Sequence, residues 1–262
     1  MPDVNNLSDA VTYEVRGHYA ILTINRPEAR NAVNGAVANG IEAGVDLVAE
    51  SDDVWVGILT GVPPVFCAGA DLKEINSGNA AALGTERGGF GGFVQRDRTK
   101  PFVAAVDGPA LAGGTELALA CDLIVASTSA TFGLPEVKRS LVAAAGGLFR
   151  LPRKIPFNIA MEVALTGDPI SAARADHFGL VNVLCDDGKA LDGAITLADR
   201  ICANAPVAVR ETRRIVLEGT NAPDDVGWRM SFDGIAAAMG SEDFKEGLTA
   251  FIEKRPPNWT GR

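Results

Sequence analysis

The sequence contains few of the residues that bind metals or form cross-links. Among its 262 residues there are 4 cysteines and 2 histidines. The cysteines form no CxxC pair and each lies among apolar residues, so we expect buried free thiols and a reducing compartment. His18 and His177 have no partner at the spacing of metal ligands, so we expect no metal site. The four cysteines are Cys67, Cys121, Cys185 and Cys202.

Long apolar runs and an excess of positive charge are also missing. No run approaches the ~18 apolar residues of a membrane-spanning helix, and the opening MPDVNNLSDA lacks the basic start and apolar centre of a signal peptide. The 24 lysines and arginines are outnumbered by 33 aspartates and glutamates, a formal net charge of −9. We therefore expect a cytoplasmic protein with no membrane or nucleic-acid partner, because nucleic acids bind basic surfaces. A phosphorylated small molecule is not excluded, since it needs only local cations and helix N-termini.

Several common catalytic and nucleotide-binding motifs are absent. The sequence has no P-loop and no G-x-S-x-G elbow. The GGFGG stretch at 88–92 lacks the G-x-G-x-x-G spacing and follows no predicted strand, so it does not indicate dinucleotide binding. The surrounding segment 76–92 is rich in glycine, alanine and asparagine, and we predict a mobile loop beside a functional site.

What is present indicates a mixed α/β protein. Hydrophobic residues make up 47% of the chain, enough for a large core. A hairpin around Gly17, helical periodicity at 35–50 and 113–120, and short apolar runs indicate alternating strands and helices. Those runs lie at 55–60, 101–108 and 122–127.

After Glu136 the pattern becomes mainly helical, with one predicted strand at 180–184. We therefore divide the chain into an α/β core over residues 1–199 and a C-terminal helical region over 200–262. The predicted helices cover 145–165, 171–178, 188–204, 206–219, 224–238 and 241–254.

Two glycine-rich turns are the first candidate site. FCAGAD at 66–71 and PALAGG at 109–114 each follow a predicted strand and precede a helix. Small residues let the backbone approach a ligand, and N–H groups at two helix N-termini can form an oxyanion hole.

Two glutamates in apolar surroundings are the second candidate. Glu116 and Glu136 each fit the first turn of a helix, where a carboxylate complements the helix dipole. A partly apolar pocket would instead raise the pKa of the less solvated carboxylate and suit the pair for acid–base chemistry. Glu116 follows the second glycine-rich turn by two residues, but these residues alone leave both readings open.

Five motifs together resemble the enoyl-CoA hydratase/isomerase superfamily, the crotonases. The resemblance implies an α/β crotonase (ClpP-like) spiral of β-β-α repeats with a C-terminal helical trimerisation region. It also implies a hydro-lyase of acyl-CoA or fatty-acid metabolism that adds water reversibly to the 2,3 double bond of a trans-2-enoyl-CoA. The motifs are NRPEARNA (25–32), FCAGADLKE (66–74), AAVDGPALAGGTELALACD (104–122), FGLPEVK (132–138) and FIEKR (251–255).

The resemblance also assigns roles to particular residues. Backbone N–H groups of Ala70 and Gly113 would form the oxyanion hole, Glu116 would activate the water, and Glu136 would exchange the proton at the α carbon. No metal or other cofactor is expected, because CoA arrives in the substrate thioester. A homotrimer, or a hexamer built as a dimer of trimers, is implied. The residues implied to contact the substrate and CoA are Arg26, Ala29, Ala68, Asp71, Leu72, Lys73 and, from a neighbouring subunit, Lys254.

Alternatives follow from departures and from local structure. Ala143 and Ala144 replace a Pro-Gly pair common in hydratases, which puts the shape of the acyl site in question. An enoyl-CoA isomerase, a carnitinyl-CoA dehydratase and a weakly active CoA-ester-binding subunit are the alternatives, although two retained glutamates favour hydration. Asp71 could serve only as a helix cap, and Arg26 could be only a surface residue.

Overall fold

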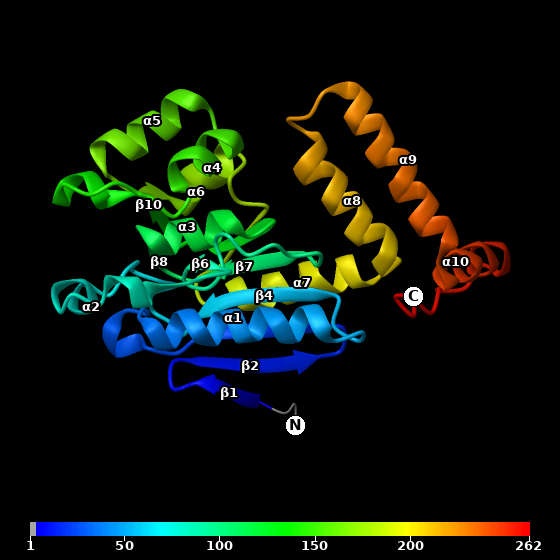
Figure 1. Cartoon of the computed structure of the whole chain (residues 1–262), viewed down its shortest axis with the longest axis horizontal. Coiled ribbons are helices and arrows are strands. Elements are labelled where there is room, and N and C mark those ends of the chain that lie inside the picture. The colour runs from blue at the N-terminus through cyan, green and yellow to red at the C-terminus, as the bar shows by residue number, and fades with distance from the viewer. Residues whose placement is uncertain (1–3) are drawn as a thin grey trace.

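A seven-stranded sheet forms the centre of the molecule (Figure 1). The structure is a computed structural model that describes residues 4–262. Strand β2 is antiparallel to both of its neighbours, β1 and β3. From β3 onward each strand of the sheet is parallel to the next. This arrangement confirms the predicted hairpin at Gly17 and the α/β class. In sheet order the strands are β1 (Val4–Ser8), β2 (Val11–Arg16), β3 (Tyr19–Ile24), β4 (Val56–Gly61), β7 (Phe102–Val106), β9 (Leu123–Ser127) and β12 (Val183–Cys185).

The spiral repeat appears where parallel strands continue into a second, three-stranded sheet. After β7 the chain bends into β8 (Pro109–Leu111) and then helix α3 (Gly113–Ala120). After β9 it bends into β10 (Thr131–Gly133) and the 3-10 helix η3 (Pro135–Arg139). Strands β8 and β10 are parallel neighbours, and β11 (Ile170–Ser171) completes this sheet. The repeat therefore brings the starts of α3 and η3 to the same edge of the molecule.

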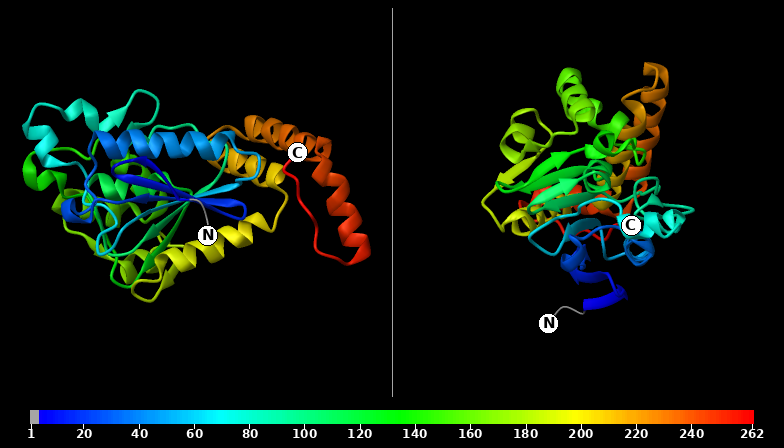
Figure 2. Two further views of the ribbon diagram at one scale, coloured as in Figure 1. Left: turned by 90° about the horizontal axis from the view of Figure 1, so that it is seen from below. Right: turned by 90° about the vertical axis from the view of Figure 1, so that its left-hand side faces the viewer.

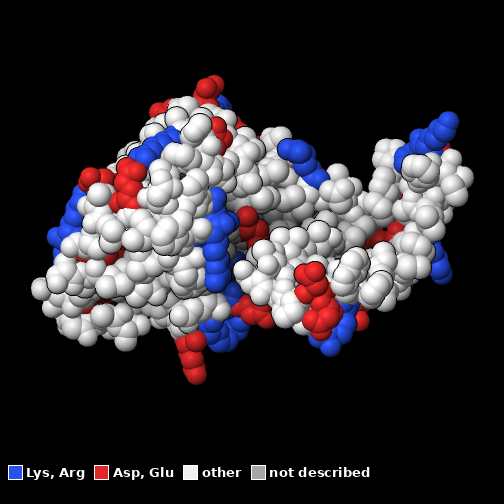
Figure 3. All heavy atoms as spheres, turned by 90° about the horizontal axis from the view of Figure 1, so that it is seen from above, with Lys and Arg blue, Asp and Glu red and all other residues white. Residues whose placement is uncertain are grey.

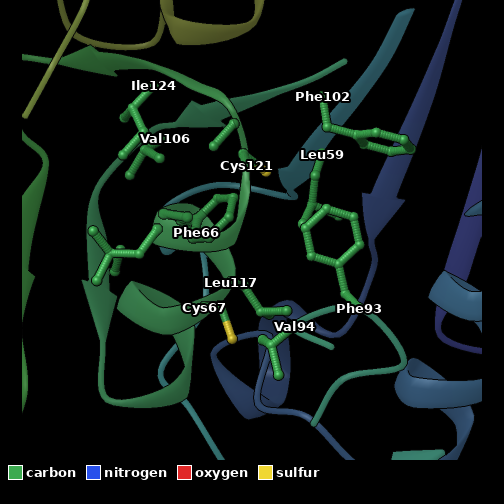
Figure 4. Close-up of a cluster of buried hydrophobic side chains, with 14 of the residues drawn as sticks. Leu59, Phe66, Cys67, Phe93, Val94, Phe102, Val106, Leu117, Cys121 and Ile124 are labelled. Carbon is green, nitrogen blue, oxygen red and sulfur yellow. The ribbon is translucent and has the colours of Figure 1, made fainter. Parts of the chain in front are cut away.

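Helices cover both faces of the large sheet. Helix α1 (Gly35–Glu50) buries Val37, Ile41, Val45 and Val48, a spacing that forms one apolar face. Helix α7 (Ala190–Cys202) packs against β4, β7 and β9 on the other face. Figure 4 shows Phe66, Phe93, Phe102 and Leu117 in the core cluster beside these strands.

The predicted single helix at 145–165 was wrong. Two helices occupy this segment, α4 (Gly147–Lys154) and α5 (Phe157–Thr166). Ile155 is extended and Pro156 precedes the second helix, because proline disfavours helical backbone in the residue before it. Helix α4 consequently starts at Gly147, which matters for the site.

The predicted loop at 76–92 contains more regular structure than its composition indicates. It includes the 3-10 helix η2 (Ala80–Leu83) and a short hairpin of β5 (Gly84–Thr85) and β6 (Gly89–Phe90). The remaining short helices are η1 (Pro27–Ala29), α2 (Leu72–Asn76) and α6 (Ala172–His177).

The C-terminal helices project from the body of the molecule (Figures 1 and 2). They are α8 (Pro206–Gly219), α9 (Asp224–Gly240) and α10 (Glu242–Glu253). The predicted division at residue 199 falls inside α7 and stays a prediction. No helix among residues 4–262 has the length and apolar character needed to cross a bilayer.

The cysteines only partly follow the prediction. All four are free thiols, and two of them, Cys67 and Cys121, are buried. Cys185 and Cys202 are only half-buried, because they lie on the outer strand β12 and at the end of α7.

Candidate active site

The two glycine-rich turns lie against each other, backbone to backbone. Gly69 has φ +95°, and a Cβ there would lie 2.7 Å from the Cβ of Ala112 and 3.1 Å from the Gly113 nitrogen. A Cβ on Gly114 would clash with the carbonyl oxygen of Cys67. Only glycine permits both the conformation at Gly69 and these approaches. The predicted pairing of the turns therefore holds.

The N–H groups of Ala70 and Gly113 are free to bind a ligand. Val33 exchanges hydrogen bonds with Gly69 and Asp71 on either side of Ala70, so the N–H of Ala70 faces away from Val33. Gly113 is the first residue of α3, where N–H groups have no partner within the helix. Neither N–H donates to another group among residues 4–262.

Backbone strain lies next to this pair. Ala112 has φ 52° and ψ −126°, a conformation that costs a non-glycine residue about 1–3 kcal/mol. The strained residue immediately precedes Gly113 and sets the direction of its N–H group. Such strain is found where a backbone group must be aimed at a ligand. Nothing in the sequence marks Ala112 for this role.

Glu116 lies in the first turn of α3 and is almost fully buried. The Gly147 N–H donates to its Oε1 at 2.9 Å. The pKa of Glu116 is raised to about 7: burial is the largest cause and the nearby charge of Glu136 adds to it, while the N–H groups of Gly147 and Ala145 and the charge of Arg150 oppose the shift. The side chain can therefore gain or lose a proton near neutral pH.

The segment that precedes Glu116 is fixed by one hydroxyl group. Thr115 Oγ1 accepts a hydrogen bond from the Gly133 N–H at 3.0 Å and lies 2.7 Å from the Ala110 carbonyl oxygen. Strands β8 and β10 thereby hold the first turn of α3 in place. This bond positions Glu116 relative to the strand that leads to Glu136.

Glu136 lies in the first turn of η3, at the end of the second repeat. Burial raises the pKa of Glu136. Its Oε2 is buried and has no hydrogen-bond partner within residues 4–262. A buried carboxyl oxygen without a partner is costly unless a ligand or water supplies one, so the arrangement favours a functional role over a dipole partner alone.

Two of the predicted CoA-contacting residues bind each other. Arg26 Nη1 donates to the Ala32 carbonyl oxygen at 2.7 Å and to Asp71 Oδ2 at 3.1 Å. Asp71 Oδ1 in turn accepts from the Lys73 N–H at 3.0 Å and caps α2. The capping reading of Asp71 is therefore correct, and Arg26 is a half-buried clamp between η1 and α2.

The other predicted contacts divide into two groups. Ala29 and Ala68 are half-exposed beside this clamp, and Leu72 and Lys73 are exposed on α2. Lys254 lies at the C-terminus of α10, at the opposite end of the molecule from α2 (Figure 1). Arg26, Asp71 and Lys73 therefore contact one another, Gly69 links their segment to Gly113 at the start of α3, and Glu136 acts on Glu116; the role of each in binding substrate stays a prediction, and Lys254 lies apart from them.

A cavity of ≈ 510 Å³ lies over η2 and the β5–β6 hairpin, and one of its lining residues, Phe90, contacts the turn that contains Ala112 and Gly113, called the oxyanion turn below. It is lined by residues between 80 and 90, including Leu83 and Phe90. The Phe90 ring lies against Gly113, since a Cβ on that glycine would clash with the ring. The predicted placement of segment 76–92 beside a functional site agrees with this contact, although no motif in the sequence marks Phe90 itself.

A larger cavity, of ≈ 1590 Å³, lies elsewhere, between α3, α4 and α8. It holds none of the predicted site residues and is lined by charged side chains such as Arg98, Asp122 and Arg213. Figure 3 shows both signs of charge beside the hollow between the body and the C-terminal helices.

In the part of the chain that the structure describes, no three His, Cys, Asp or Glu side chains could hold a metal ion together.

Known proteins are similar to this chain in sequence and in fold. A sequence profile of the family described as enoyl-CoA hydratase/isomerase matches residues 15–262. Enoyl-CoA hydratase EchA19 of Mycobacterium tuberculosis is 39% identical, with 100% of both chains covered. Mevalonyl-coenzyme A hydratase sidH of Aspergillus fumigatus is also 39% identical, over 92% of this chain and 91% of that protein. A crystal structure of enoyl-CoA hydratase from Mycobacterium tuberculosis has a TM-score of 0.93 and 50% identity, covering 97% of this chain and 99% of that one.

Proposed function

We propose that this chain, which belongs to the enoyl-CoA hydratase/isomerase family, adds water reversibly to the 2,3 double bond of a trans-2-enoyl-CoA. The chain is accordingly an enoyl-CoA hydratase, a hydro-lyase. The observation that carries the mechanism is the placement of a buried carboxyl group, Glu116, and a half-buried one, Glu136, whose Oε2 is buried without a partner, in the repeat that also carries two unpaired backbone N–H groups.

The two N–H groups would stabilise the charge that develops during hydration. When hydroxide equivalent adds to the β carbon, negative charge moves onto the thioester carbonyl oxygen. Donation from Ala70 and Gly113 to that oxygen lowers the barrier, and each such donor contributes roughly 3–4 kcal/mol. Because Ala112 and Gly69 fix both turns, the donors need no rearrangement when the charge appears.

The two glutamates would move the protons. Ionised Glu116 takes a proton from water as the oxygen bonds to the β carbon. Protonated Glu136 gives its proton to the α carbon, and the product is a 3-hydroxyacyl-CoA. A pKa of about 7 suits Glu116 for the base role at neutral pH. A proton that passes from Glu116 to Glu136 restores the starting state.

The CoA portion would lie along the surface formed by the Arg26–Asp71 clamp and α2. The small side chains of Ala29 and Ala68 leave room for the CoA portion of the substrate, and Leu72 and Lys73 are exposed and can contact it. The substrate supplies CoA as its thioester, so this reaction needs no separate cofactor. The acyl group would enter the cavity beside Phe90.

An assembly of three or six subunits is supported by the exposed apolar face of α9. Trp228, Phe232, Ile235 and Met239 follow a helical spacing and are all more than half exposed. Lys254 follows α10, which lies at the opposite end of the molecule from α2 (Figure 1), so a neighbouring subunit would supply the lysine that contacts CoA. The free thiols favour a reducing compartment such as the cytoplasm.

Product analysis tests the reaction against its nearest alternative. Purified protein is incubated with crotonyl-CoA and, separately, with a 3-enoyl-CoA. The proposal predicts 3-hydroxybutyryl-CoA from crotonyl-CoA. Migration of the double bond without hydroxylated product would identify an isomerase, and binding without turnover of either thioester would identify a CoA-ester-binding subunit.

A further inference from the structure

Arg150 lies in α4, and its guanidinium joins two loops that border the site. Its Nη1 donates to the Ala145 carbonyl oxygen at 3.2 Å, and its Nη2 donates to the Val94 carbonyl oxygen at 2.6 Å. The side chain is partly buried. A planar guanidinium suits this task, because it presents several donors in a fixed geometry.

The first loop carries the groups that hold Glu116. Ala145 and Gly147 both direct backbone N–H groups at the Glu116 carboxylate, Gly147 at 2.9 Å. The guanidinium of Arg150 lies directly against Gly146, where a Cβ would clash with Nη1. Arg150 thus contacts the backbone at Ala145 and at Gly146, immediately before the Gly147 N–H that binds Glu116.

The second loop carries the aromatic residue beside the oxyanion turn. Val94 lies four residues after Phe90, the last residue of β6. The Phe90 ring lies against Gly113. One guanidinium therefore links the segment that lines the acyl cavity to the segment that holds Glu116. None of the sequence motifs marked Arg150.

The charge of Arg150 also acts on Glu116. The charged groups that face Glu116 are Glu136 from η3 and Arg150 from α4, and they act in opposite directions. Around Arg150 itself lie Arg98, Arg153, Lys154 and Cys121, from α4 and neighbouring segments. Arg150 is the cation that favours an ionised Glu116, with burial working against it.

We propose that Arg150 is a positioning residue for hydration: its guanidinium holds the 145–147 backbone against Glu116 and ties that backbone to the segment that follows Phe90. This inference rests on the proposed function for its kinetic consequences. Its structural consequence, control over the proton affinity of Glu116, does not require turnover. Arg150 touches neither the oxyanion turn nor the CoA surface, so its loss should affect kcat more than KM.

The test compares two variants. Arg150→Met removes the charge, and Arg150→Lys keeps the charge but loses the paired guanidinium donors, called the fork below. Arg153→Met is the matched control, because Arg153 lies on the same helix, stacks on the same Phe149 ring and is exposed. Each protein carries ¹³C-labelled glutamate, and the carboxyl signal of Glu116 is assigned by its loss in Glu116→Gln. The titration of that signal and the kcat and KM for crotonyl-CoA are measured against pH.

Arg150→Met should tighten proton binding to Glu116 by about two- to threefold, lower kcat by about tenfold or more and leave KM within about threefold. Arg150→Lys should keep the titration near that of wild type and still lose kcat, and Arg153→Met should match wild type in all respects.

If Arg150→Met fails to fold, Arg150→Lys decides: wild-type kcat in that variant overturns the role of the fork. Wild-type titration and kcat in folded Arg150→Met overturn the whole inference. A moved titration in a protein that never hydrates crotonyl-CoA would contradict the proposed function and leave the Arg150 link supported.

Discussion

Glu116 is a carboxylic acid held in the interior of the molecule, with one hydrogen bond from Gly147 at 2.9 Å and a second carboxyl group, Glu136, nearby. Burial is the largest cause of its raised pKa. The sequence predicts a catalytic role for both glutamates only through the family motifs around them, because apolar surroundings and a first-turn position fit a dipole partner equally well. It could not predict Gly147, Arg150 or Ala112, since their roles depend on loop conformations and on contacts between distant segments.

The pH dependence of stability follows from the raised pKa. Folded Glu116 has a pKa of about 7 against 4.5 in an unfolded chain, so the folded state binds the proton more tightly. That contribution is complete below pH 4.5 and is lost as the pH rises through 7. Glu116→Gln has no such loss and should gain about 3 kcal/mol in free energy of unfolding relative to wild type between pH 4.5 and pH 8.

Denaturant unfolding of wild type and Glu116→Gln at several pH values measures this difference. Lys73→Gln is a suitable control, because Lys73 is an exposed charged residue on the CoA side. A difference between Glu116→Gln and wild type that stays constant across this pH range would contradict a raised pKa in the folded protein.

At the scale of elements, the repeat of strand, bend, short strand and helix places the site. The alternation of β7, β8 and α3 and of β9, β10 and η3 delivers both glutamates to one edge. Apolar runs and periodicity in the sequence predicted the long strands and most helices. They did not predict the break at Pro156 or the hairpin in 76–92, because a continuous helical pattern conceals a single proline and glycine-rich segments have no period.

The contact between Phe90 and Gly113 gives a prediction at this scale. Gly113→Ala should push the Phe90 ring away and displace the oxyanion N–H, so kcat should fall by about 100-fold. The double variant Gly113→Ala/Phe90→Ala relieves the clash and should recover part of the activity. Steady-state kinetics with crotonyl-CoA and thermal unfolding of both variants measure this, and equal kcat in Gly113→Ala and wild type would show that the Phe90 ring moves aside without displacing the N–H of Gly113, contrary to this prediction.

At the scale of the whole molecule, the C-terminal helices present an apolar face that the chain itself does not cover. Trp228 and Phe232 are 64% and 65% exposed on α9, and burying such a face is worth about 25 cal/mol for each Å² removed from water. The sequence predicted the helices and, by resemblance, their use in trimerisation. It could not predict which face stays exposed, because that depends on how α8 and α9 pack.

Phe232→Asp should therefore dissociate the assembly, because a charge on the contact face must be desolvated there. Arg229→Asp, on the charged side of the same helix, is the control. Light scattering coupled to size exclusion should give three or six times the 27.3 kDa chain mass for wild type and control, and the single chain mass for Phe232→Asp. A wild type of single chain mass would rule out the trimer and the contribution of Lys254 from a neighbour.

The hydration of crotonyl-CoA by wild type, Glu116→Gln and Glu136→Gln tests the central claim most directly. The loss of enoyl-thioester absorbance is followed at saturating substrate, with folding of each variant checked by circular dichroism. If the two glutamates share the proton transfers, wild type hydrates crotonyl-CoA and kcat falls by about 100-fold or more in each variant. Wild-type rates in either variant would show that the proton transfers do not depend on that glutamate, and the two-carboxylate mechanism would be wrong.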